Sequence, residues 1–513
     1  MNSPDFLLTK IIATLGPATS SVETITQLIY NGVRVFRINF SHGAFKEYAK
    51  LIRNIRKAEK QTGKYIAIMG DLSGPKIRLG KVIDGGLHLL IGQKFIFVKE
   101  NIVSGSPGYE NILSTTFPSF INDINNGERI LLDDGNAELK LLKKNGTGKK
   151  AELICEVVRG GLITSAKGIN LPDTQLSVEA LTTKDKLCAE FAVEKKLDYL
   201  ALSFVRQADD IRQLKTLLVK LGARPKHEDQ FADRPGMVFP PVSNLEFIPI
   251  ITKIEKPQAI QNLEEIVKET DSVMVARGDL GVEMDLADVA LLQKKIIHLC
   301  QEYGKPVIVA TQMLESMIHA PVPTRAEVSD VANAIFDGAD AVMLSGETAV
   351  GKYPVKAVGM MNKIALRTNA YIKQHSIYPG VAILKPELSL RNAAIATAVK
   401  EVSRDVKPVF LVVWTNWGGS ALYLSQQRLP IPLLAFTADK KRLRMLNLLY
   451  GVESVYMRQP SSGSKFIKAI DELLISKGWA KEKDPIIVVS GDPIRRIGLA
   501  NRVVIHYVGE SVD

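Results

Sequence analysis

Short apolar runs recur along the first two-thirds of the chain, and each is followed by a segment whose apolar residues repeat with helical spacing. The runs begin near residues 9, 33, 65, 197, 248, 272, 305 and 341. Apolar residues fill nearly every position of these runs, which is typical of parallel strands buried on both faces. About eight strand–helix units is the number that closes a TIM barrel. The pattern therefore predicts an α/β chain built on a (β/α)8 barrel.

One long interval breaks this rhythm, from about Arg78 to Leu197. Most of it alternates short polar and apolar pieces around glycine-containing turns such as 84–86, 134–135 and 145–146. This alternation is typical of short antiparallel strands joined by tight turns. We therefore expect a small β-barrel domain inserted into a loop of the barrel, over residues 78–170.

The strand–helix pattern restarts after about residue 371, where five further apolar runs alternate with helical stretches. This predicts a separate doubly wound α/β domain. The expected domains are a discontinuous barrel at 1–77 and 171–370, the inserted domain at 78–170, and a C-terminal regulatory domain at 371–513. A segment at 222–244, rich in Pro, Asp and Arg, has no periodicity and is interpreted as a surface loop or insertion of unusual length.

Polar residues gather where the predicted barrel strands end. Catalytic groups of such barrels lie at the C-terminal ends of the strands. Taken singly, a strand-end Asp or Ser is usually a cap or turn residue. Here seven strands in a row end in such groups, which favours a site: Arg37, Asn39 and Ser41; Asp71; Ser203; Lys253 and Glu255; Arg277 and Asp279; Thr311; Glu347.

Lys253 and Glu255 are two residues apart on one predicted strand, so their side chains leave on the same face. They form either a buried ion pair, which adds little stability, or a centre for phosphoryl transfer, in which the lysine neutralises the phosphoryl group. In the second case Asp279 on the next strand is a second carboxylate. Two carboxylates with substrate oxygens and water suit Mg²⁺, and no cluster of His or Cys competes for a transition metal.

The formal net charge is +11, without a long run of like charge. It indicates either a solvated basic surface or attraction of small anionic substrates. No basic patch interleaved with aromatic residues supports nucleic-acid binding. Three widely spaced cysteines, Cys155, Cys188 and Cys300, indicate a reducing compartment rather than a disulfide framework. With no signal peptide and no apolar run near the ~18 residues of a membrane span, a cytoplasmic protein without membrane association is expected.

Nine segments, in order along the chain, resemble the motifs of the pyruvate kinase family. They are 14–17 (TLGP), 37–43 (RINFSHG), 71–78 (DLSGPKIR), 167–172 (KGINLP), 251–255 (ITKIE), 274–283 (MVARGDLGVE), 310–317 (ATQMLESM), 323–327 (PTRAE) and 344–348 (LSGET). The resemblance extends over essentially the whole chain. It implies transfer of the phosphoryl group of phosphoenolpyruvate to ADP, giving pyruvate and ATP, and the architecture already predicted from periodicity.

The resemblance also implies roles for individual residues. Lys253 matches the lysine that stabilises the transferring phosphoryl group, and Thr311 the residue that positions the proton for the enolate. The phosphoenolpyruvate site is implied at Arg37, Lys253, Gly278, Asp279 and Thr311, and Mg²⁺ or Mn²⁺ at Glu255 and Asp279. The nucleotide-phosphate contacts match Asn39, Ser41, His42, Arg78 and Lys167. Lys167 lies on the inserted domain, so closure of that domain as a lid is expected to bring it to the phosphates.

Two departures from the family bear on regulation and on cations. Family members that bind K⁺ do so through positions that match Asn39, Ser41, Asp71 and the carbonyl of Leu72, together with a glutamate whose position holds Lys76 here. A tethered ammonium can replace the ion, so a K⁺ requirement is not expected; the alternative is that Lys76 is a solvated loop residue. The family's effector loop matches Thr415, Asn416, Gly418, Gly419 and Ser420, with Gly419 where a basic residue is usual.

A phosphorylated allosteric effector and a homotetramer are implied, and the chain is most similar to bacterial enzymes activated by AMP or sugar monophosphates. Two other functions compete with this interpretation: a barrel lyase or carboxylase acting on the same substrates, and a silent phosphometabolite-binding protein. Pyruvate formation measured with and without ADP and Mg²⁺ separates the three.

Overall fold

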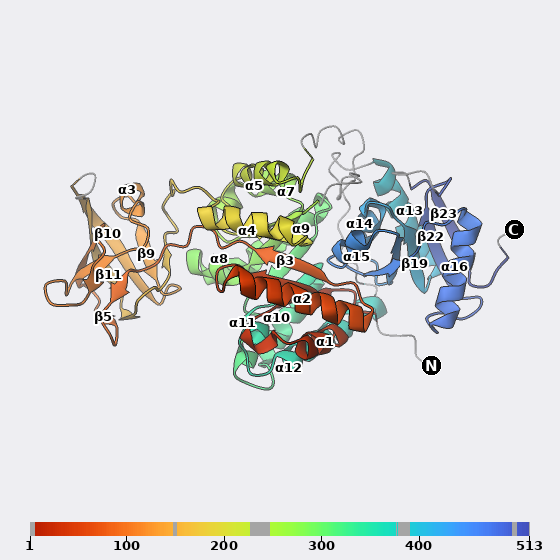
Figure 1. Cartoon of the computed structure of the whole chain (residues 1–513), viewed down its shortest axis with the longest axis horizontal. Helices are drawn as coiled ribbons and strands as arrows, with labels where there is room; N and C mark the ends of the chain where they lie inside the picture. The colour runs from red at the N-terminus through yellow and green to blue at the C-terminus, as the bar shows by residue number, and fades with distance from the viewer. Residues whose placement is uncertain are drawn as a thin grey trace.

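The computed structural model describes residues 6–146, 151–225, 247–375, 377, 390–494 and 500–511. Residues 222–225 begin the segment interpreted as an insertion, and the rest of that segment lies outside the described residues. Three bodies follow one another along the longest axis of the molecule: an all-β domain at one end, a barrel in the middle, and an α/β domain at the other end (Figure 1).

The central body is a closed barrel of eight parallel strands, as the sequence predicted. Its strands pair in the order β1-β18-β17-β16-β15-β14-β3-β2, and β1 pairs with both β2 and β18 to close the ring. The strands are β1 (Lys10–Thr14), β2 (Val33–Asn39), β3 (Ala67–Asp71), β14 (Tyr199–Leu202), β15 (Ile250–Ile254), β16 (Ser272–Ala276), β17 (Val307–Ala310) and β18 (Ala341–Leu344).

Helices surround the barrel, and the apolar residues of each strand serve two separate cores. In β15, Ile250 and Ile254 pack in the cluster between strands and helices, whereas Ile251 packs with Met274 inside the barrel. Lys253 is therefore on the inner face, as the spacing predicted. The surrounding helices are α1 (Val22–Tyr30), α2 (Phe45–Thr62), α4 (Thr183–Glu194), α5 (Ala208–Lys220), α6 (Pro257–Gln261), α7 (Leu263–Glu269), α8 (Arg277–Glu283), α9 (Leu286–Glu302), α10 (Arg325–Phe336), α11 (Gly346–Ala349) and α12 (Pro354–Gln374).

Helix starts are marked by the residue types that cap orphan backbone N–H groups. The side chains of Ser21, Thr182, Asp285 and Thr324 each accept a hydrogen bond from a backbone N–H in the first turn of α1, α4, α9 and α10. At the other end of α2, Gly63 adopts φ 65°, the left-handed conformation that glycine tolerates best. These residues mark where each of these helices begins or ends.

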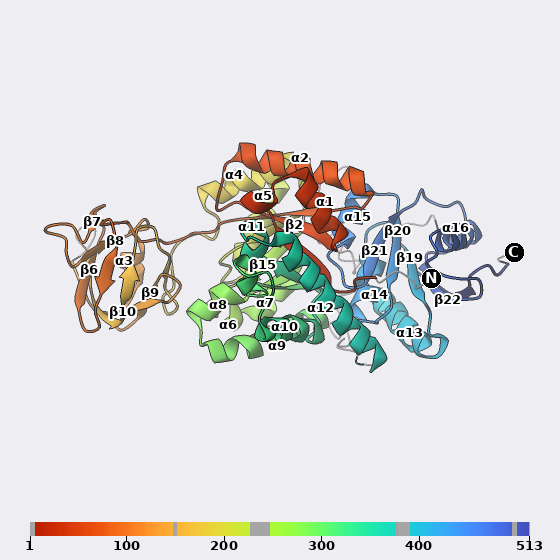
Figure 2. The ribbon, with the colours of Figure 1, turned by 90° about the horizontal axis from the view of Figure 1, so that it is seen from below.

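The inserted domain is all-β apart from the short helix α3 (Phe120–Asp123). A six-stranded sheet, in the order β13-β9-β10-β11-β6-β8, is accompanied by two two-stranded sheets, β12-β5 and β4-β7. Two extended segments join the domain to the barrel (Figure 2). The strands are β4 (Lys81–Val82), β5 (Leu87–Leu89), β6 (Lys94–Val98), β7 (Val103–Ser104), β8 (Ile112–Ser114), β9 (Arg129–Leu132), β10 (Ala137–Asn145), β11 (Glu152–Arg159), β12 (Gly161–Ile163) and β13 (Ile169–Asn170).

The C-terminal domain is a five-stranded sheet in the order β21-β20-β19-β22-β23, with helices packed on it. Four strands are parallel, and β23 joins the edge antiparallel to β22. The elements are α13 (Leu390–Val406), β19 (Phe410–Trp414), α14 (Gly419–Gln426), β20 (Leu433–Thr437), α15 (Lys440–Leu446), β21 (Val452–Tyr456), α16 (Gly463–Ser476), β22 (Pro485–Ser490) and β23 (Arg502–Tyr507).

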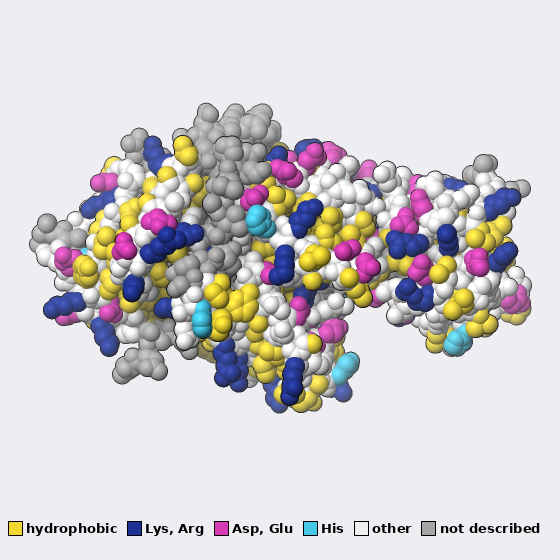
Figure 3. All heavy atoms as spheres, turned by 180° about the vertical axis from the view of Figure 1, so that it is seen from behind, with side chains coloured by type: hydrophobic (Ala, Val, Ile, Leu, Met, Phe, Trp, Pro, Cys, Tyr) yellow, Lys and Arg dark blue, Asp and Glu magenta, His cyan; other side chains and the backbone are white. Residues whose placement is uncertain are grey.

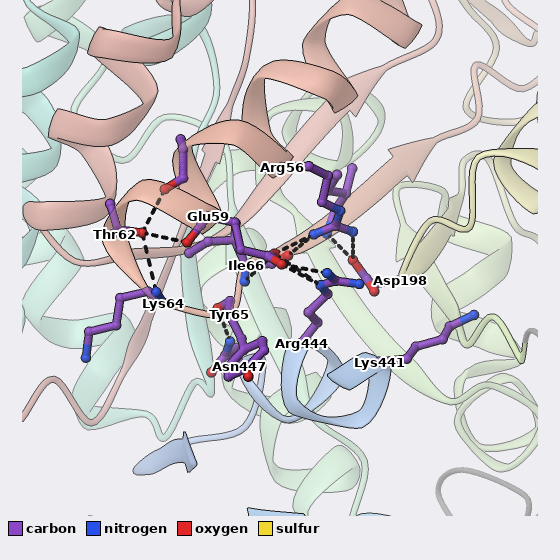
Figure 4. Close-up of polar contacts among 12 residues, drawn as sticks. Arg56, Glu59, Thr62, Lys64, Tyr65, Ile66, Asp198, Lys441, Arg444 and Asn447 are labelled. Atoms are coloured by element: carbon purple, nitrogen blue, oxygen red, sulfur yellow. Dashed lines mark hydrogen bonds and ion pairs between the residues drawn. The ribbon is translucent and has the colours of Figure 1, made fainter. Parts of the chain in front are cut away.

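Polar contacts join the barrel to the C-terminal domain between α2 and α15 (Figure 4). Arg444 donates to both carboxylate oxygens of Glu59, with Nη2 2.5 Å from Oε1 and Nε 3.1 Å from Oε2. The amide nitrogen of Asn447 donates to the carbonyl of Tyr65 at 2.5 Å. A two-pronged arginine–carboxylate pair fixes orientation as well as distance, so these contacts define how the two bodies dock.

Surface charges of both signs are interspersed over all three bodies on the face shown in Figure 3. The net charge of +11 is therefore not gathered into one continuous basic stripe on that face. Cys155, Cys188 and Cys300 are buried and unpaired. Among the helices in the described ranges, none combines the length and apolar content that a membrane span requires.

Candidate active site

Lys253 lies near the C-terminal end of β15 with its ammonium group among acidic and hydroxyl oxygens. Its Nζ donates to Oγ of Ser203 at 2.9 Å, and lies 2.5 Å from Oε1 of Glu255 and 3.7 Å from Oδ2 of Asp71. Burial alone would lower the pKa of Lys253, but the charges of Asp71, Glu255 and Asp279 outweigh it and raise the pKa. The lysine is therefore buried and held in its charged form. The ion pair that the sequence left open exists, but within a larger cluster.

Arg37 projects from β2 into the same cluster. Its Nε donates to Oδ2 of Asp71 at 2.6 Å, and its Nη1 donates to Oγ1 of Thr14 at 3.2 Å. Burial favours a raised pKa for Asp71, yet the positive charges of Lys253 and Arg37 lower it overall. Asp71 thus contacts both cations of the cluster.

Glu255 and Asp279 supply the two carboxylates expected at a metal site. Oε2 of Glu255 accepts from the backbone N–H of Phe204 at 2.7 Å, and Asp279 sits in the first turn of α8. Burial and the nearby charge of Asp279 raise the pKa of Glu255, although Lys253 opposes the change. A divalent cation would relieve this repulsion. The described residues contain no group of three or more His, Cys, Asp and Glu side chains arranged to hold a metal ion. Carboxylate oxygens are ligands for a hard cation, which also binds substrate oxygens and water.

Thr311 follows β17 in an unusual backbone conformation. Its φ is 68°, and that of Gln312 is 54°, in the left-handed region that β-branched residues rarely adopt. Its Oγ1 accepts from the N–H of Gly278 at 2.6 Å, and a Cβ at Gly278 would lie only 3.2 Å from this oxygen. Arg277 donates to the carbonyl of Thr311 at 3.0 Å and pairs with Asp330 at 2.6 Å. Such strain is typical of positions where a functional group must be aimed.

A cavity of ≈ 430 Å³ opens between the barrel mouth and the inserted domain. Five basic residues line it, namely Lys76, Arg78, Lys167, Arg206 and Lys256, together with the carboxylates of Asp133, Asp134 and Asp279. In this structure Lys167 pairs with Asp133 at 2.8 Å, and Nη1 of Arg78 donates to the carbonyl of Ala166 at 2.8 Å. Two of the five predicted nucleotide contacts, Arg78 and Lys167, are thus brought to one cavity with a predicted metal ligand.

The other three predicted nucleotide contacts lie at the end of β2. The N–H of Ser41 donates to Oδ1 of Asn39 at 3.0 Å, and the side chain of His42 is exposed. Partial burial lowers the pKa of His42, and the positive charges of Lys76 and Arg78 lower it further. His42 does not line the cavity itself.

Two family models match the chain. The model described as "Pyruvate kinase, barrel domain" matches residues 7–227 and 242–358, and "Pyruvate kinase, alpha/beta domain" matches residues 393–506. The chain belongs to the pyruvate kinase family. Residues 228–241, inside the segment interpreted as an insertion, lie outside the match to the barrel model.

Relatives of this family match over nearly the full length. The chain is 37% identical to a pyruvate kinase of Mycobacterium intracellulare, covering 98% of both chains, and 38% identical to one of Agrobacterium vitis, covering 96% of this chain and 95% of that one. A crystal structure of a pyruvate kinase from Cryptosporidium parvum superposes with a TM-score of 0.85 at 30% identity, covering 98% of this chain and 96% of that one.

As a pyruvate kinase, the protein transfers the phosphoryl group of phosphoenolpyruvate to ADP, giving pyruvate and ATP, and uses a divalent metal. The family assignment favours this reaction over the lyase or carboxylase and over the silent binding protein.

Lys256 lines the same cavity as Asp279, and the sequence analysis missed it. Its side chain is buried, lines the cavity, and pairs with Glu283 of α8. Oε1 of Glu283 also accepts from Nδ2 of Asn170 at 2.7 Å, on the last strand of the inserted domain. The pair thus links the barrel to the inserted domain. The position of Lys256, directly after Glu255 at a strand end, was the signal that could have identified it.

The region predicted for a monovalent cation is already rich in fixed charge. The carbonyl of Leu72 accepts from Oγ of Ser203 at 2.7 Å, while Asp71 is held by Arg37 and Lys253. Partial burial and the charge of Lys253 lower the pKa of Lys76, against the opposite influence of Asp279 and Glu255. The side chain of Lys76 is exposed, and it lines the same cavity as Asp279.

The segment predicted to hold an effector links β19 to α14. Gly418 adopts φ 86° and donates its N–H to Oγ1 of Thr415 at 2.9 Å, which shapes a tight turn. Thr415, Gly418 and Gly419 are buried, whereas Asn416 and Ser420 are partly exposed. The turn leaves part of its polar surface open at the start of α14.

Proposed function

We propose that Lys253 neutralises the phosphoryl group while it passes from phosphoenolpyruvate to ADP. The P–O bond to the enol oxygen breaks, a bond to a terminal phosphate oxygen of ADP forms, and enolpyruvate is left. The observation that supports this role is the buried ammonium group held charged by Glu255 and Asp71 at the barrel mouth. A fixed charge in a site that excludes water stabilises developing negative charge more than the same charge in water does.

Arg37, Gly278, Asp279 and Thr311 complete the phosphoenolpyruvate site. Arg37 presents its guanidinium group to the phosphate from a position fixed by Asp71. The hydroxyl of Thr311, on its strained backbone, positions the proton that reaches the enolate carbon, which gives pyruvate. Arg277 contributes indirectly because it holds the carbonyl of Thr311.

Glu255 and Asp279 hold Mg²⁺ or Mn²⁺. When bound, the ion neutralises phosphate oxygens and orients them for displacement. Glu255→Gln is expected to raise the Mn²⁺ concentration needed for half-maximal binding at least roughly tenfold. Loss of a residue that only supports a metal ligand already costs about that much affinity. Electron paramagnetic resonance of Mn²⁺ measures this without turnover. The matched control is Glu264→Gln, a half-exposed carboxylate of α7; equal Mn²⁺ binding by both variants contradicts the assignment.

Arg78, Lys167, Asn39, Ser41 and His42 bind the phosphates of the nucleotide. Lys167 exchanges its partner Asp133 for a phosphate when the inserted domain closes as a lid. Closure excludes water from the cavity, which strengthens each of these charged contacts.

Lys76 replaces a monovalent cation, so activity is independent of K⁺. Assayed with tetramethylammonium as the sole monovalent cation, the enzyme is expected to keep most of its rate. Lys76→Glu is expected to lower the K⁺-free rate by on the order of tenfold or more, ~1.4 kcal/mol in activation free energy, with recovery on adding K⁺. Near-total loss of the wild-type rate without K⁺ contradicts the proposal.

Thr415, Asn416, Gly418, Gly419 and Ser420 hold a phosphorylated effector at the start of α14, where backbone N–H groups favour an anion. At least one of AMP, ribose 5-phosphate, glucose 6-phosphate and fructose 1,6-bisphosphate is expected to lower the phosphoenolpyruvate concentration for half-maximal rate. Ser420→Ala is expected to weaken that activation. If none of the four activates, or the variant responds like the wild type, the assignment is wrong.

The protein is cytoplasmic and assembles as a homotetramer. Light scattering of the purified protein measures the number of subunits. The barrel comprises 1–77 and 171–370, the lid 78–170 and the regulatory domain 371–513. The bridge between Arg78 and Gly168 supports the lid boundaries, and limited proteolysis tests all of them.

A further inference from the structure

A second cavity, of ≈ 830 Å³, lies between the barrel and the C-terminal domain. One wall is the last helix of the barrel, α12, which ends beside the C-terminal domain (Figure 2). The other wall includes Phe410 at the start of β19 and Trp479 after α16. Leu8, just before β1, also lines the cavity. The cavity is therefore at the N-terminal face of the barrel, opposite the face that holds Lys253.

The amide of Asn369 on α12 is the first sign of a ligand in this cavity. The residue is 5% exposed, and neither Nδ2 nor Oδ1 has a hydrogen-bond partner among the described residues. A buried polar group without a partner costs about 1–3 kcal/mol, and such groups are rare in native proteins. A ligand that offers an acceptor next to a donor satisfies both atoms at once.

Aromatic rings line the same cavity as this amide. The ring of Phe6 packs edge-on against Phe410, with centroids 5.3 Å apart, and against Trp479, with centroids 5.2 Å apart. Trp479 is only partly buried, so part of its ring is open to the cavity. An indole face of this kind stacks with planar rings.

Three exposed cations, Arg367, Lys373 and Lys481, line the rim. Within the described residues none of the three forms an ion pair. Asp484 is the one carboxylate of the lining, and its Oδ2 accepts from the backbone N–H of Lys481 at 2.7 Å. The excess of positive charge favours an anion.

We propose that this cavity binds a planar heterocyclic anion whose ring edge carries an N–H beside a C=O. The ring stacks on Trp479, the edge pairs with the amide of Asn369, and the anionic group meets Arg367 and Lys373. Such a ligand touches α12 and the C-terminal domain at once, and therefore stabilises their relative position. It is chemically distinct from phosphoenolpyruvate, which has no ring.

Three small probes separate the parts of the proposal. Orotate has the ring, the N–H and C=O edge and the charge; uracil has the ring and the edge without the charge; benzoate has a ring and the charge without the edge. Each is titrated calorimetrically into the full-length enzyme with saturating phosphoenolpyruvate and Mg²⁺ but no ADP, so that the active site is occupied. Orotate is expected to bind once per chain, at least tenfold more tightly than either other probe. Absence of saturable orotate binding overturns the proposal.

Two variants test the contacts. Asn369→Leu is expected to weaken orotate at least tenfold and to leave benzoate unchanged, because only orotate uses the amide. Arg367→Ser with Lys373→Ser is expected to weaken orotate and benzoate but not uracil. An unchanged turnover number in each variant shows that it is folded. Orotate binding that is equal in wild type and Asn369→Leu places the ligand elsewhere and overturns the assignment.

Discussion

Lys253→Ala is expected to lower kcat by several orders of magnitude, corresponding to on the order of 5 kcal/mol or more of lost transition-state stabilisation. The lysine charge is buried and fixed by Glu255, Asp71 and Ser203, so it needs no reorganisation when negative charge develops on the phosphoryl group. The KM for phosphoenolpyruvate is expected to change much less than kcat, since the charge acts mainly in the transition state. Steady-state kinetics at saturating ADP and Mg²⁺ measure both.

Lys268→Ala is the matched control for this experiment. Lys268 lies on α7 with its side chain 43% exposed and 3.7 Å from Glu264, and its removal is expected to leave kcat unchanged. Circular dichroism of both variants establishes that the fold is intact. A loss below about tenfold for Lys253→Ala, roughly 1.4 kcal/mol, removes the lysine from its proposed role.

The barrel was predictable because its strands carry their own signal. A strand buried on both faces must be apolar at nearly every position, so runs such as the one at 305–310 stand out from the sequence alone. The polar residues that end those runs then mark one face of the barrel, which is why Lys253, Glu255, Asp279 and Thr311 could be grouped before any geometry was known. Chain order and strand direction suffice for that grouping.

The pattern of apolar and polar residues did not predict which side chains contact one another. Lys256 follows Glu255 directly, yet its partner Glu283 and the lid residue Asn170 are far apart in the sequence. The left-handed backbone at Thr311 likewise has no signature in residue type, because threonine disfavours it. Both features depend on tertiary packing, which hydrophobic periodicity does not encode.

The contacts between the barrel and the C-terminal domain were likewise not predictable from the sequence. Arg444 and Glu59 are 385 residues apart and face each other across two bodies. Each residue alone belongs to an ordinary amphipathic helix with a charged face. The sequence therefore predicts two domains but not the surfaces through which they meet, nor the cavity that contains Asn369.

Asp340 is a buried carboxylate at the contact between the barrel and the C-terminal domain. Both Asp340 and Arg428 have side chains with 0% exposure, and Nη2 of Arg428 donates to Oδ2 of Asp340 at 2.6 Å. The same carboxylate accepts from the backbone N–H of Val307 at 2.8 Å and of Tyr450 at 3.2 Å. The Asp340 side chain thus contacts β17 of the barrel and, in the C-terminal domain, Arg428 and Tyr450.

Asp340→Ala is therefore expected to destabilise the protein by about 3–5 kcal/mol, because it leaves the guanidinium group of Arg428 buried without a counter-charge. Thermal and urea unfolding, monitored by tryptophan fluorescence, measure the loss. Adding Arg428→Met is expected to recover part of it, since the uncompensated charge is then gone. The pair Glu401–Arg404 has the same 2.6 Å separation but is more than half exposed, so Glu401→Ala is expected to shift neither midpoint. Equal midpoints for Asp340→Ala and Glu401→Ala would mean that burial of the ion pair does not stabilise the contact between the two domains.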